Sequence, residues 1–243
     1  REKTNSIEKI KHPIIKEVLK KFKKNSKRIE ITTLAEIPSG TGLGSSGSFT
    51  TSLMKCMYLH NKKDISKHKL AEEACDIEIN KLKEPVGKQD QFIASYGGIK
   101  IFNIDKKGKV KVSALNINQK IKKKLENNLL LFFTGYTRHS SSILKKQDAD
   151  SKKENHTTLK NLKQIKEIGY YSKKLIESND LSEFGKLLDY HWQIKKKRAS
   201  NMSNKNIDLI YNDALKNGAL GGKLVGAGGG GFLMFYAKNP MQL

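Results

Sequence analysis

The sequence predicts an α+β fold with two lobes, and two observations support this prediction. The chain has 243 residues and 37% of them are apolar, which is enough for one large core or two modest ones. The expected helices and strands follow one another in a mixed order, which favours α+β over a regular parallel sheet. We expect one lobe over residues 1–126 and the other over residues 127–243.

Apolar residues that recur every three or four positions predict the helices of the first lobe, and short alternating or apolar runs predict its strands. Pro13 lies near the first turn of the first helix, where proline is tolerated. In chain order we expect a helix over 8–24, a strand over 28–35, a glycine loop over 38–47, an apolar helix from Phe49, a helix over 66–82, an apolar strand within 90–96, and a hairpin of strands 99–104 and 110–115.

The second lobe is expected to follow a short helix near 118–126. A glycine turn is expected between its last two strands. Its elements in chain order are a strand over 129–134, helices over 141–147, 153–177, 181–200 and 204–217, and strands over 222–226 and 231–237.

A net charge of +23 suggests a nucleic-acid partner, but the kind and placement of the basic residues argue against one. Only four of the 47 basic residues are arginine, the side chain suited to bidentate phosphate and base contacts. The lysines lie on nearly every segment, and aromatic residues for base stacking make up only 7%. The composition therefore favours solvated lysine faces over a nucleic-acid interface.

Other features of the whole chain indicate its cellular environment and its extent. No apolar run approaches the roughly 18 residues that a membrane-spanning helix needs, so no membrane partner is expected. Cys56 and Cys75 fall in apolar helical patterns, which predicts reduced, buried thiols in a cytoplasmic protein. The chain begins at Arg1 without an initiator Met, so we expect a fragment of a longer protein. The sequence leaves the oligomeric state open, with a homodimer as one option.

The glycine loop is the clearest candidate binding segment, because a strand, a glycine-rich turn and a helix start together form an anion site. Nucleotide phosphate is the expected occupant, and an ordinary structural loop is the alternative. Ser45 or Ser46 could cap the helix and offer a hydroxyl to Mg²⁺. The expected nucleotide-binding residues are Pro38, Ser39, Gly40, Thr41, Gly42, Leu43, Gly44, Ser45, Ser46 and Gly47.

Two common nucleotide-binding folds do not fit this loop. A G-x-G-x-x-G pattern occurs at Gly42, Gly44 and Gly47, but it recurs in the glycine turn near the end of the chain, so the pattern alone is weak evidence. A dinucleotide-binding fold also needs a second strand ending in an acidic residue about 20 positions later, where a helix is expected instead. The P-loop pattern fails because no lysine precedes the serines.

Two carboxylates are candidates for metal binding and catalysis. Glu78 falls in the middle of the apolar face of the helix over 66–82, where a carboxylate is costly unless a cation or hydrogen-bond donors meet it. Glu78 is therefore a candidate Mg²⁺ ligand, with a buried salt bridge as the alternative. Asp90 stands in the polar cluster 87–91 next to an apolar segment, where a catalytic base could lie.

The glycine loop, Glu78 with Asp90, and the glycine turn 222–231 resemble, in this order, the second and third motifs of the GHMP small-molecule kinases. Within that superfamily the chain most resembles the D-glycero-D-manno-heptose 7-phosphate kinases. The strings that carry this second resemblance are PSGTGLGSS over 38–46, GKQDQ over 87–91, FTGYTR over 133–138 and WQIKK over 192–196.

The resemblance implies a two-lobed GHMP kinase fold, with a first lobe like domain 2 of ribosomal protein S5 and a ferredoxin-like second lobe. The family's first motif and its last strand and helix find no counterpart in this chain. The family uses ATP and Mg²⁺ to phosphorylate the anomeric hydroxyl of a heptose phosphate.

Roles for individual residues follow from the same resemblance. The glycine loop would hold the ATP phosphates, Glu78 and one of the two serines would hold Mg²⁺, and Asp90 would accept or orient the sugar hydroxyl proton. Gly226 and Gly228 of the glycine turn would lie beside the substrate, and a hairpin without ligand contact is the alternative.

The phosphate of a sugar-phosphate substrate needs cations of its own. Arg138 follows the strand over 129–134 and precedes a serine-rich helix start, which makes it one candidate. Lys195 continues the apolar stripe of its helix and is expected to leave the core face at the end of that stripe, where it would meet the substrate.

Three other functions compete with this interpretation. The first is a GHMP kinase of an unphosphorylated sugar, such as fucose or galactose, which would leave Arg138 and Lys195 without a phosphate to bind. The second is a basic nucleic-acid-binding module, whose binding would fall steeply with salt. The third is a catalytically inactive relative that binds ATP as a sensor.

Overall fold

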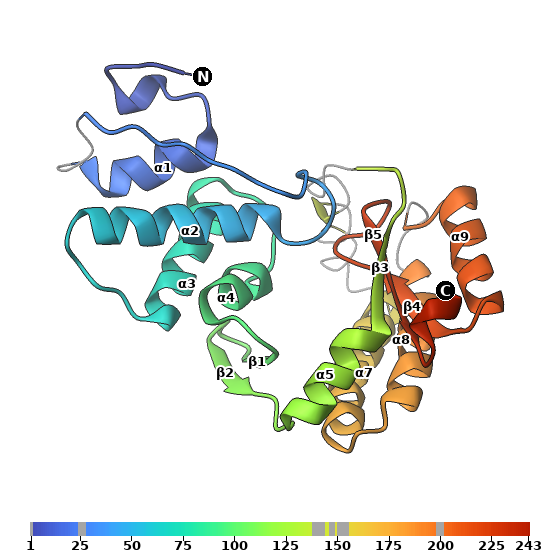
Figure 1. The fold of residues 1–243 in the computed structure, drawn as a ribbon. Helices are drawn as coiled ribbons and strands as arrows, with labels where there is room; N and C mark the ends of the chain where they lie inside the picture. Colours follow the sequence, from blue (N-terminus) through green and yellow to red (C-terminus); the bar gives the residue numbers. More distant parts are fainter. Residues whose placement is uncertain (1, 24–27, 138–143, 146–148, 150–155, 198–201) are drawn as a thin grey trace. The chain divides into compact units, whose positions relative to one another are not determined.

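The computed structural model describes residues 2–23, 28–137, 144–145, 149, 156–197 and 202–243. Two compact units, here called unit 1 and unit 2, make up the chain (Figure 1). Unit 1 comprises Arg1–Ser39 and Gly44–Phe102, and unit 2 comprises Gly40–Leu43 and Asn103–Leu243. The expected lobe boundary between residues 126 and 127 stays a prediction.

Unit 1 is mainly helical. Its first α-helix begins at Pro13 because proline fits the first helical position, and His12 caps it by accepting a hydrogen bond from the Ile15 N–H. The helix therefore starts five residues later than expected, after a short 3₁₀ turn. The helices of unit 1 are η1 (Ile7–Lys9), α1 (Pro13–Lys21), α2 (Ser45–His60), α3 (Lys67–Cys75), η3 (Asp76–Lys81) and α4 (Gln89–Tyr96).

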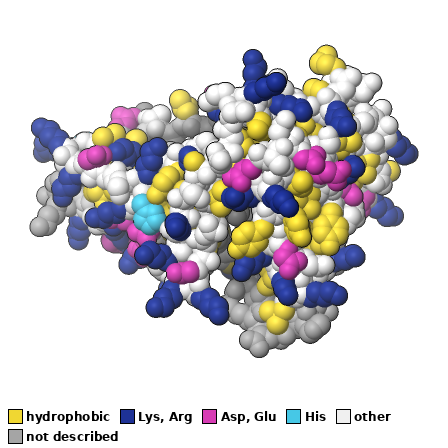
Figure 2. All heavy atoms as spheres, turned by 90° about the horizontal axis from the view of Figure 1, so that it is seen from below, with side chains coloured by type: hydrophobic (Ala, Val, Ile, Leu, Met, Phe, Trp, Pro, Cys, Tyr) yellow, Lys and Arg dark blue, Asp and Glu magenta, His cyan; other side chains and the backbone are white. Residues whose placement is uncertain are grey.

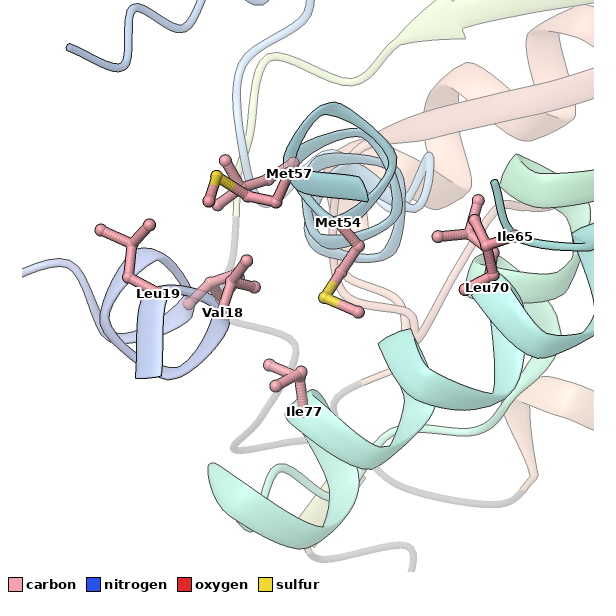
Figure 3. Close-up of a cluster of buried hydrophobic side chains, with 9 residues drawn as sticks. Val18, Leu19, Met54, Met57, Ile65, Leu70 and Ile77 are labelled. Carbon is pink, nitrogen blue, oxygen red and sulfur yellow. The ribbon is translucent and has the colours of Figure 1, made fainter. Parts of the chain in front are cut away.

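The core of unit 1 is built by apolar faces of these helices. In Figure 3, Val18 and Leu19 of α1 point toward Met54 and Met57 of α2. Ile65, Leu70 and Ile77 lie along the neighbouring segment that ends in η3. Burial of these side chains holds the helices together, because each removes apolar surface from water.

The helix expected over 66–82 is present, but its hydrogen bonding changes partway along. An α-helix covers Lys67–Cys75, and a π-helix, η3, continues it over Asp76–Lys81. Ile77 and Glu78 are both buried in this π-helical segment. The wider turn of a π-helix alters which residues face the core, and such segments often occur at functional sites.

Two of the strands expected in unit 1 do not form in the described residues. Residues 28–35 form no strand, because a strand needs a partner for its backbone groups and none of the described strands pairs with this segment. Ile29 and Ile31 nevertheless pack against the core of unit 1. Residues 90–96 belong to a helix, α4, on which Phe92 and Tyr96 stack one turn apart, with 6.3 Å between ring centroids.

The described residues form two sheets. The expected hairpin is confirmed as a two-stranded sheet of β1 (Lys100–Ile104) and β2 (Val110–Ala114). Unit 2 contains a three-stranded sheet in the order β3-β5-β4. Both of its pairings are antiparallel, with Leu129 opposite Tyr236 and Leu224 opposite Leu233. Its strands are β3 (Leu129–Phe133), β4 (Ala219–Leu224) and β5 (Phe232–Ala237).

The helices of unit 2 are confirmed where the chain is described, and α8 packs against β4 and β5. Trp192 of α8, Tyr211 of α9 and Phe235 of β5 share the buried core. The helix expected over 141–147 lies mostly outside the described residues. The helices are α5 (Gln119–Asn128), α7 (His156–Glu177), α8 (Leu181–Lys196) and α9 (Lys205–Lys216), and the chain ends with the 3₁₀ turn η4 (Pro240–Gln242).

Surface features agree in part with the composition. On the face shown in Figure 2, Lys and Arg side chains are spread among acidic and apolar ones and form no single stripe. Cys75 is buried as expected, but Cys56 is exposed, because it lies on the solvent side of α2. Among the described helices, none combines the length and the apolar character needed to cross a membrane.

Candidate active site

The start of α2 in unit 1 has the backbone geometry expected of an anion site. Gly44 is the N-cap residue with φ of 72°, a left-handed conformation that glycine adopts without strain. No side chain of the described residues caps this helix, so the expected capping by Ser45 or Ser46 is wrong. The first N–H groups of α2 therefore lack the usual side-chain partner, and the helix dipole favours an anion beside them.

Asp90 of α4 lies directly against this helix start, within unit 1. A Cβ placed on Gly44 would lie 3.2 Å from Cγ of Asp90, and one placed on Gly47 would lie 2.8 Å from its Cβ. Only glycine allows α2 and α4 to approach this closely. The structure thus brings together the end of the glycine loop and the predicted catalytic carboxylate, which are more than 40 residues apart in the sequence.

The environment of Asp90 disfavours its charged form. Burial raises the pKa of this carboxyl, and the nearby negative charge of Glu78 raises it further. A carboxylate with a raised pKa is a stronger base than an exposed one, which suits a group that takes a proton from an alcohol. Protonation of Asp90 in acid would remove this base.

Glu78 is only 1% exposed, as expected from its position on the apolar face. Its partner is neither a lysine nor an arginine of the described residues, so the alternative of a buried salt bridge is not supported. Instead, Nε2 of Gln91, a side chain that is also 1% exposed, donates a hydrogen bond of 2.9 Å to Oε1 of Glu78. On its other side, Gln91 contacts the thiol of Cys75, whose pKa is raised to about 12 by burial.

The donor set in unit 1 fits a magnesium ion. Mg²⁺ at phosphoryl-transfer sites is held by one or two carboxylates together with substrate phosphates and water, and it prefers oxygen ligands. The buried Glu78 and the half-buried Asp90 carry like charges that affect each other, and a divalent cation would neutralise them. Within the described ranges, no three His, Cys, Asp or Glu side chains gather as a larger metal-binding group.

In unit 2, the middle of the glycine loop packs against the glycine turn that follows β4. A Cβ on Gly42 would lie 2.7 Å from the carbonyl oxygen of Val225, and a Cβ on Gly226 would lie 2.6 Å from Cα of Gly42. Thr41 is completely buried, and a Cβ on Gly231 would lie 2.0 Å from its carbonyl oxygen. The two backbones touch, so the glycine turn fixes the conformation of this part of the loop.

Lys195 of α8 supports the glycine turn that follows β4. Its Nζ donates hydrogen bonds of 2.9 Å to the Leu224 carbonyl and 2.6 Å to the Gly226 carbonyl. The side chain is 7% exposed, so the expectation that Lys195 leaves the core face is wrong. Lys195 lies on the same buried face of α8 as the apolar residues before it. Its ammonium can be buried there because it donates two hydrogen bonds to backbone carbonyls. A role in binding substrate phosphate stays a prediction.

Replacing Lys195 with Met tests this support. Met has a similar length but leaves two carbonyls without a charged donor, so we expect the free energy of unfolding to fall by about 1–3 kcal/mol. The measurement is urea unfolding followed by circular dichroism. Lys197→Met, at an exposed position of the same helix end, is the control and should change stability by less than about 0.5 kcal/mol. Equal stability of the two variants would contradict the proposed support.

The remaining predicted residues are placed as follows. Gly228 packs against Met202, whose Sδ would lie 2.8 Å from a Cβ at that position. Arg138 lies outside the described residues. Contacts of Gly226, Gly228 and Lys195 with a substrate stay predictions.

Two residues of the site had no role in the sequence-based prediction. Gln91 holds Glu78, and Gly231 gives room to Thr41. Gln91 follows Asp90 directly, but its partners lie 13 and 16 residues earlier, so no local pattern connects them. Gly231 belongs to a run of glycines, and the sequence does not indicate which of them needs the absence of a side chain.

Comparisons with known proteins match both units. Residues 10–98 match the GHMP kinases N terminal domain, and residues 172–243 match the GHMP kinases C terminal domain. The chain is 29% identical to the D-glycero-alpha-D-manno-heptose 7-phosphate kinase of Campylobacter jejuni over 92% of the chain and 65% of that protein. It is 27% identical to the bifunctional fucokinase/GDP-fucose pyrophosphorylase of Arabidopsis thaliana over 88% of the chain and 20% of that protein.

The fold has solved counterparts. The crystal structure of a D-glycero-D-manno-heptose 1-phosphate kinase from Bacteroides thetaiotaomicron matches with a TM-score of 0.68 at 24% identity, covering 93% of this chain and 62% of that one. The chain thus spans just under two thirds of the length of these heptose phosphate kinases.

Proposed function

The chain belongs to the GHMP kinase family, and from this membership we propose that it acts as an ATP-dependent sugar kinase. The acceptor is the anomeric hydroxyl of a sugar phosphate, D-glycero-D-manno-heptose 7-phosphate, and the product is its 1,7-bisphosphate. The heptose 7-phosphate kinase of C. jejuni, at 29% identity, supports this choice of substrate. A cytoplasmic location and a homodimeric state stay predictions from the sequence.

In this proposal, residues 38–47 bind the ATP phosphates, with the backbone N–H groups at the start of α2 as donors. Glu78 and the hydroxyl of Ser45 or Ser46 would hold Mg²⁺, which when bound would neutralise charge on the phosphate oxygens. Asp90 takes the proton of the sugar hydroxyl while the hydroxyl oxygen forms a bond to the γ-phosphorus. The bond between the γ-phosphorus and the bridging oxygen breaks, and ADP leaves.

The single observation that carries this proposal is the position of Asp90 against the start of α2. Its Cγ would lie 3.2 Å from a Cβ on Gly44, and the pKa of its carboxyl is raised by burial and by Glu78. A base next to the expected phosphate position can meet a hydroxyl that is poised to attack phosphorus.

The experiment is a measurement of ADP release with Mg-ATP, comparing heptose 7-phosphate, other sugar phosphates and free sugars. Turnover with heptose 7-phosphate alone is the expected result. ATP binding without turnover on any sugar would contradict the proposal and favour a catalytically inactive relative.

A second candidate is a kinase of an unphosphorylated sugar of the fucose type. The similarity to a fucokinase supports it, and so does the position of Lys195, whose ammonium holds backbone carbonyls. This candidate predicts turnover with free fucose or galactose in the same assay, and no turnover with the sugar phosphates.

The proposed metal role of Glu78 has its own test. Glu78→Gln keeps the shape of the side chain but removes its charge, so we expect the Mg²⁺ concentration for half-maximal rate to rise about tenfold or more. The measurement is a Mg²⁺ titration of ADP release. An unaltered titration would remove Glu78 from the metal site.

A further inference from the structure

Glu78 depends on one neighbouring side chain for its orientation. Among the described residues, only Nε2 of Gln91 donates a hydrogen bond to its carboxylate, at 2.9 Å to Oε1. The other oxygen, Oε2, has no such partner within the described part of unit 1. One oxygen of the carboxylate is therefore held in place, and the other is left to bind a ligand.

The orientation of the Gln91 amide is set in turn by its second neighbour. Its Oε1 lies 3.7 Å from Sγ of Cys75, and the same thiol lies 3.9 Å from the Lys88 carbonyl oxygen. Both neighbours of the thiol are acceptors, so the thiol is the donor. The reverse orientation of the amide would place its oxygen against the Glu78 carboxylate, which is repulsive.

All three side chains are almost completely buried, and they come from three elements of unit 1. Cys75 ends α3, Glu78 lies in the π-helix η3, and Gln91 lies in the first turn of α4, next to Asp90. In low-dielectric surroundings a hydrogen bond between such groups is strengthened, and its loss is costly. The two elements that carry the candidate metal ligand and the candidate base are thus joined by one amide.

We propose that Gln91 is a positioning residue, which holds Glu78 in the orientation that binds the metal, and that the Cys75 thiol holds Gln91. This inference rests on the proposed function, because it takes Glu78 as the Mg²⁺ ligand. Hydrogen bonds to metal-binding carboxylates typically contribute 10- to 100-fold to metal affinity or activity.

The experiment compares binding of a non-hydrolysable ATP analogue, adenylyl imidodiphosphate, with and without Mg²⁺, by calorimetry on the 243-residue chain. The quantity of interest is the gain in affinity that Mg²⁺ gives. Gln91→Met is expected to reduce this gain about tenfold and to leave metal-free binding unchanged. In the ADP-release assay, raising the Mg²⁺ concentration should restore the rate of this variant. Gln119→Met, at an exposed position of α5, is the matched control and should behave as the wild type.

A second variant keeps the test informative if Gln91→Met does not fold. Cys75→Val removes the thiol donor and leaves Gln91 in place. We therefore expect Cys75→Val to lose part of the Mg²⁺-dependent gain in affinity, less than Gln91→Met loses. Cys75→Ser, which keeps a donor, should restore the wild-type gain. A gain within twofold of the wild type in Gln91→Met, or in Cys75→Val where Gln91→Met does not fold, would overturn the inference. A wild-type chain without any Mg²⁺-dependent gain would overturn the metal role of Glu78 and the inference with it, whereas ADP release judges the kinase proposal separately.

Discussion

Replacing Asp90 with Asn is expected to lower kcat by about 10²- to 10⁴-fold and to leave the affinity for ATP nearly unchanged. The amide has the size of the carboxyl group, so the contacts with Gly44 and Gly47 persist, but it cannot accept the hydroxyl proton. The measurement is steady-state ADP release together with calorimetric binding of the ATP analogue. Unchanged turnover would exclude Asp90 as the base.

The same substitution is expected to raise the melting temperature, by about 2 °C near pH 7. Burial and Glu78 raise the pKa of Asp90 in the folded chain, so between the ordinary and the raised pKa the folded state binds a proton that the unfolded state does not. The free energy of unfolding therefore falls as pH rises through this window. Asn at position 90 has no charge to bury, so the variant does not lose this stability. Below the ordinary carboxyl pKa the stability advantage of Asn should vanish. A melting temperature that falls near pH 7 would contradict the assigned electrostatic cost.

Replacing Gly231 with Ala is expected to lower the free energy of unfolding by more than about 3 kcal/mol. The new Cβ would lie 2.0 Å from the Thr41 carbonyl oxygen, and φ of 98° is unfavourable for any residue with a side chain. Both backbones would have to move, which would disturb the glycine loop as well. The measurements are urea unfolding and binding of the metal-free ATP analogue, and we expect both stability and binding to decrease.

Gly135→Ala separates the two causes of this effect. Gly135 also has a positive φ, of 79°, but a Cβ there would meet no atom of the described residues within 4 Å. This control includes the backbone strain without the steric clash, so it should cost only about 1 kcal/mol. Equal losses in the two variants would show that the contact between the glycine turn and Thr41 does not limit stability.

Local patterns in the sequence were sufficient for most helices, for β3 and β5 and for the glycine loop. They placed the remaining strand of unit 2 over 222–226, whereas β4 covers Ala219–Leu224. They also placed Glu78 on the buried face of its helix, because an isolated carboxylate stands out among apolar neighbours. They were insufficient for residues 28–35 and 90–96. Alternation cannot show whether a strand has a partner, and a short apolar run is compatible with either a helix or a strand.

Tertiary structure decided the details on which the chemistry depends. Glu78 lies in the π-helical turn Asp76–Lys81, and the amide of Gln91 joins it to α4. The two side chains are 13 residues apart, so no local pattern predicts this hydrogen bond. The burial of Lys195 depends on carbonyls 29 and 31 residues later in the chain, which satisfy its ammonium away from water. The sequence by itself thus determined which residue types the site contains. Local periodicity indicates which side chains are buried, and the glycines indicate where the backbone needs conformational freedom. The direction of each side chain and the partner of each charge depend on contacts between distant segments, and only the tertiary structure decided them.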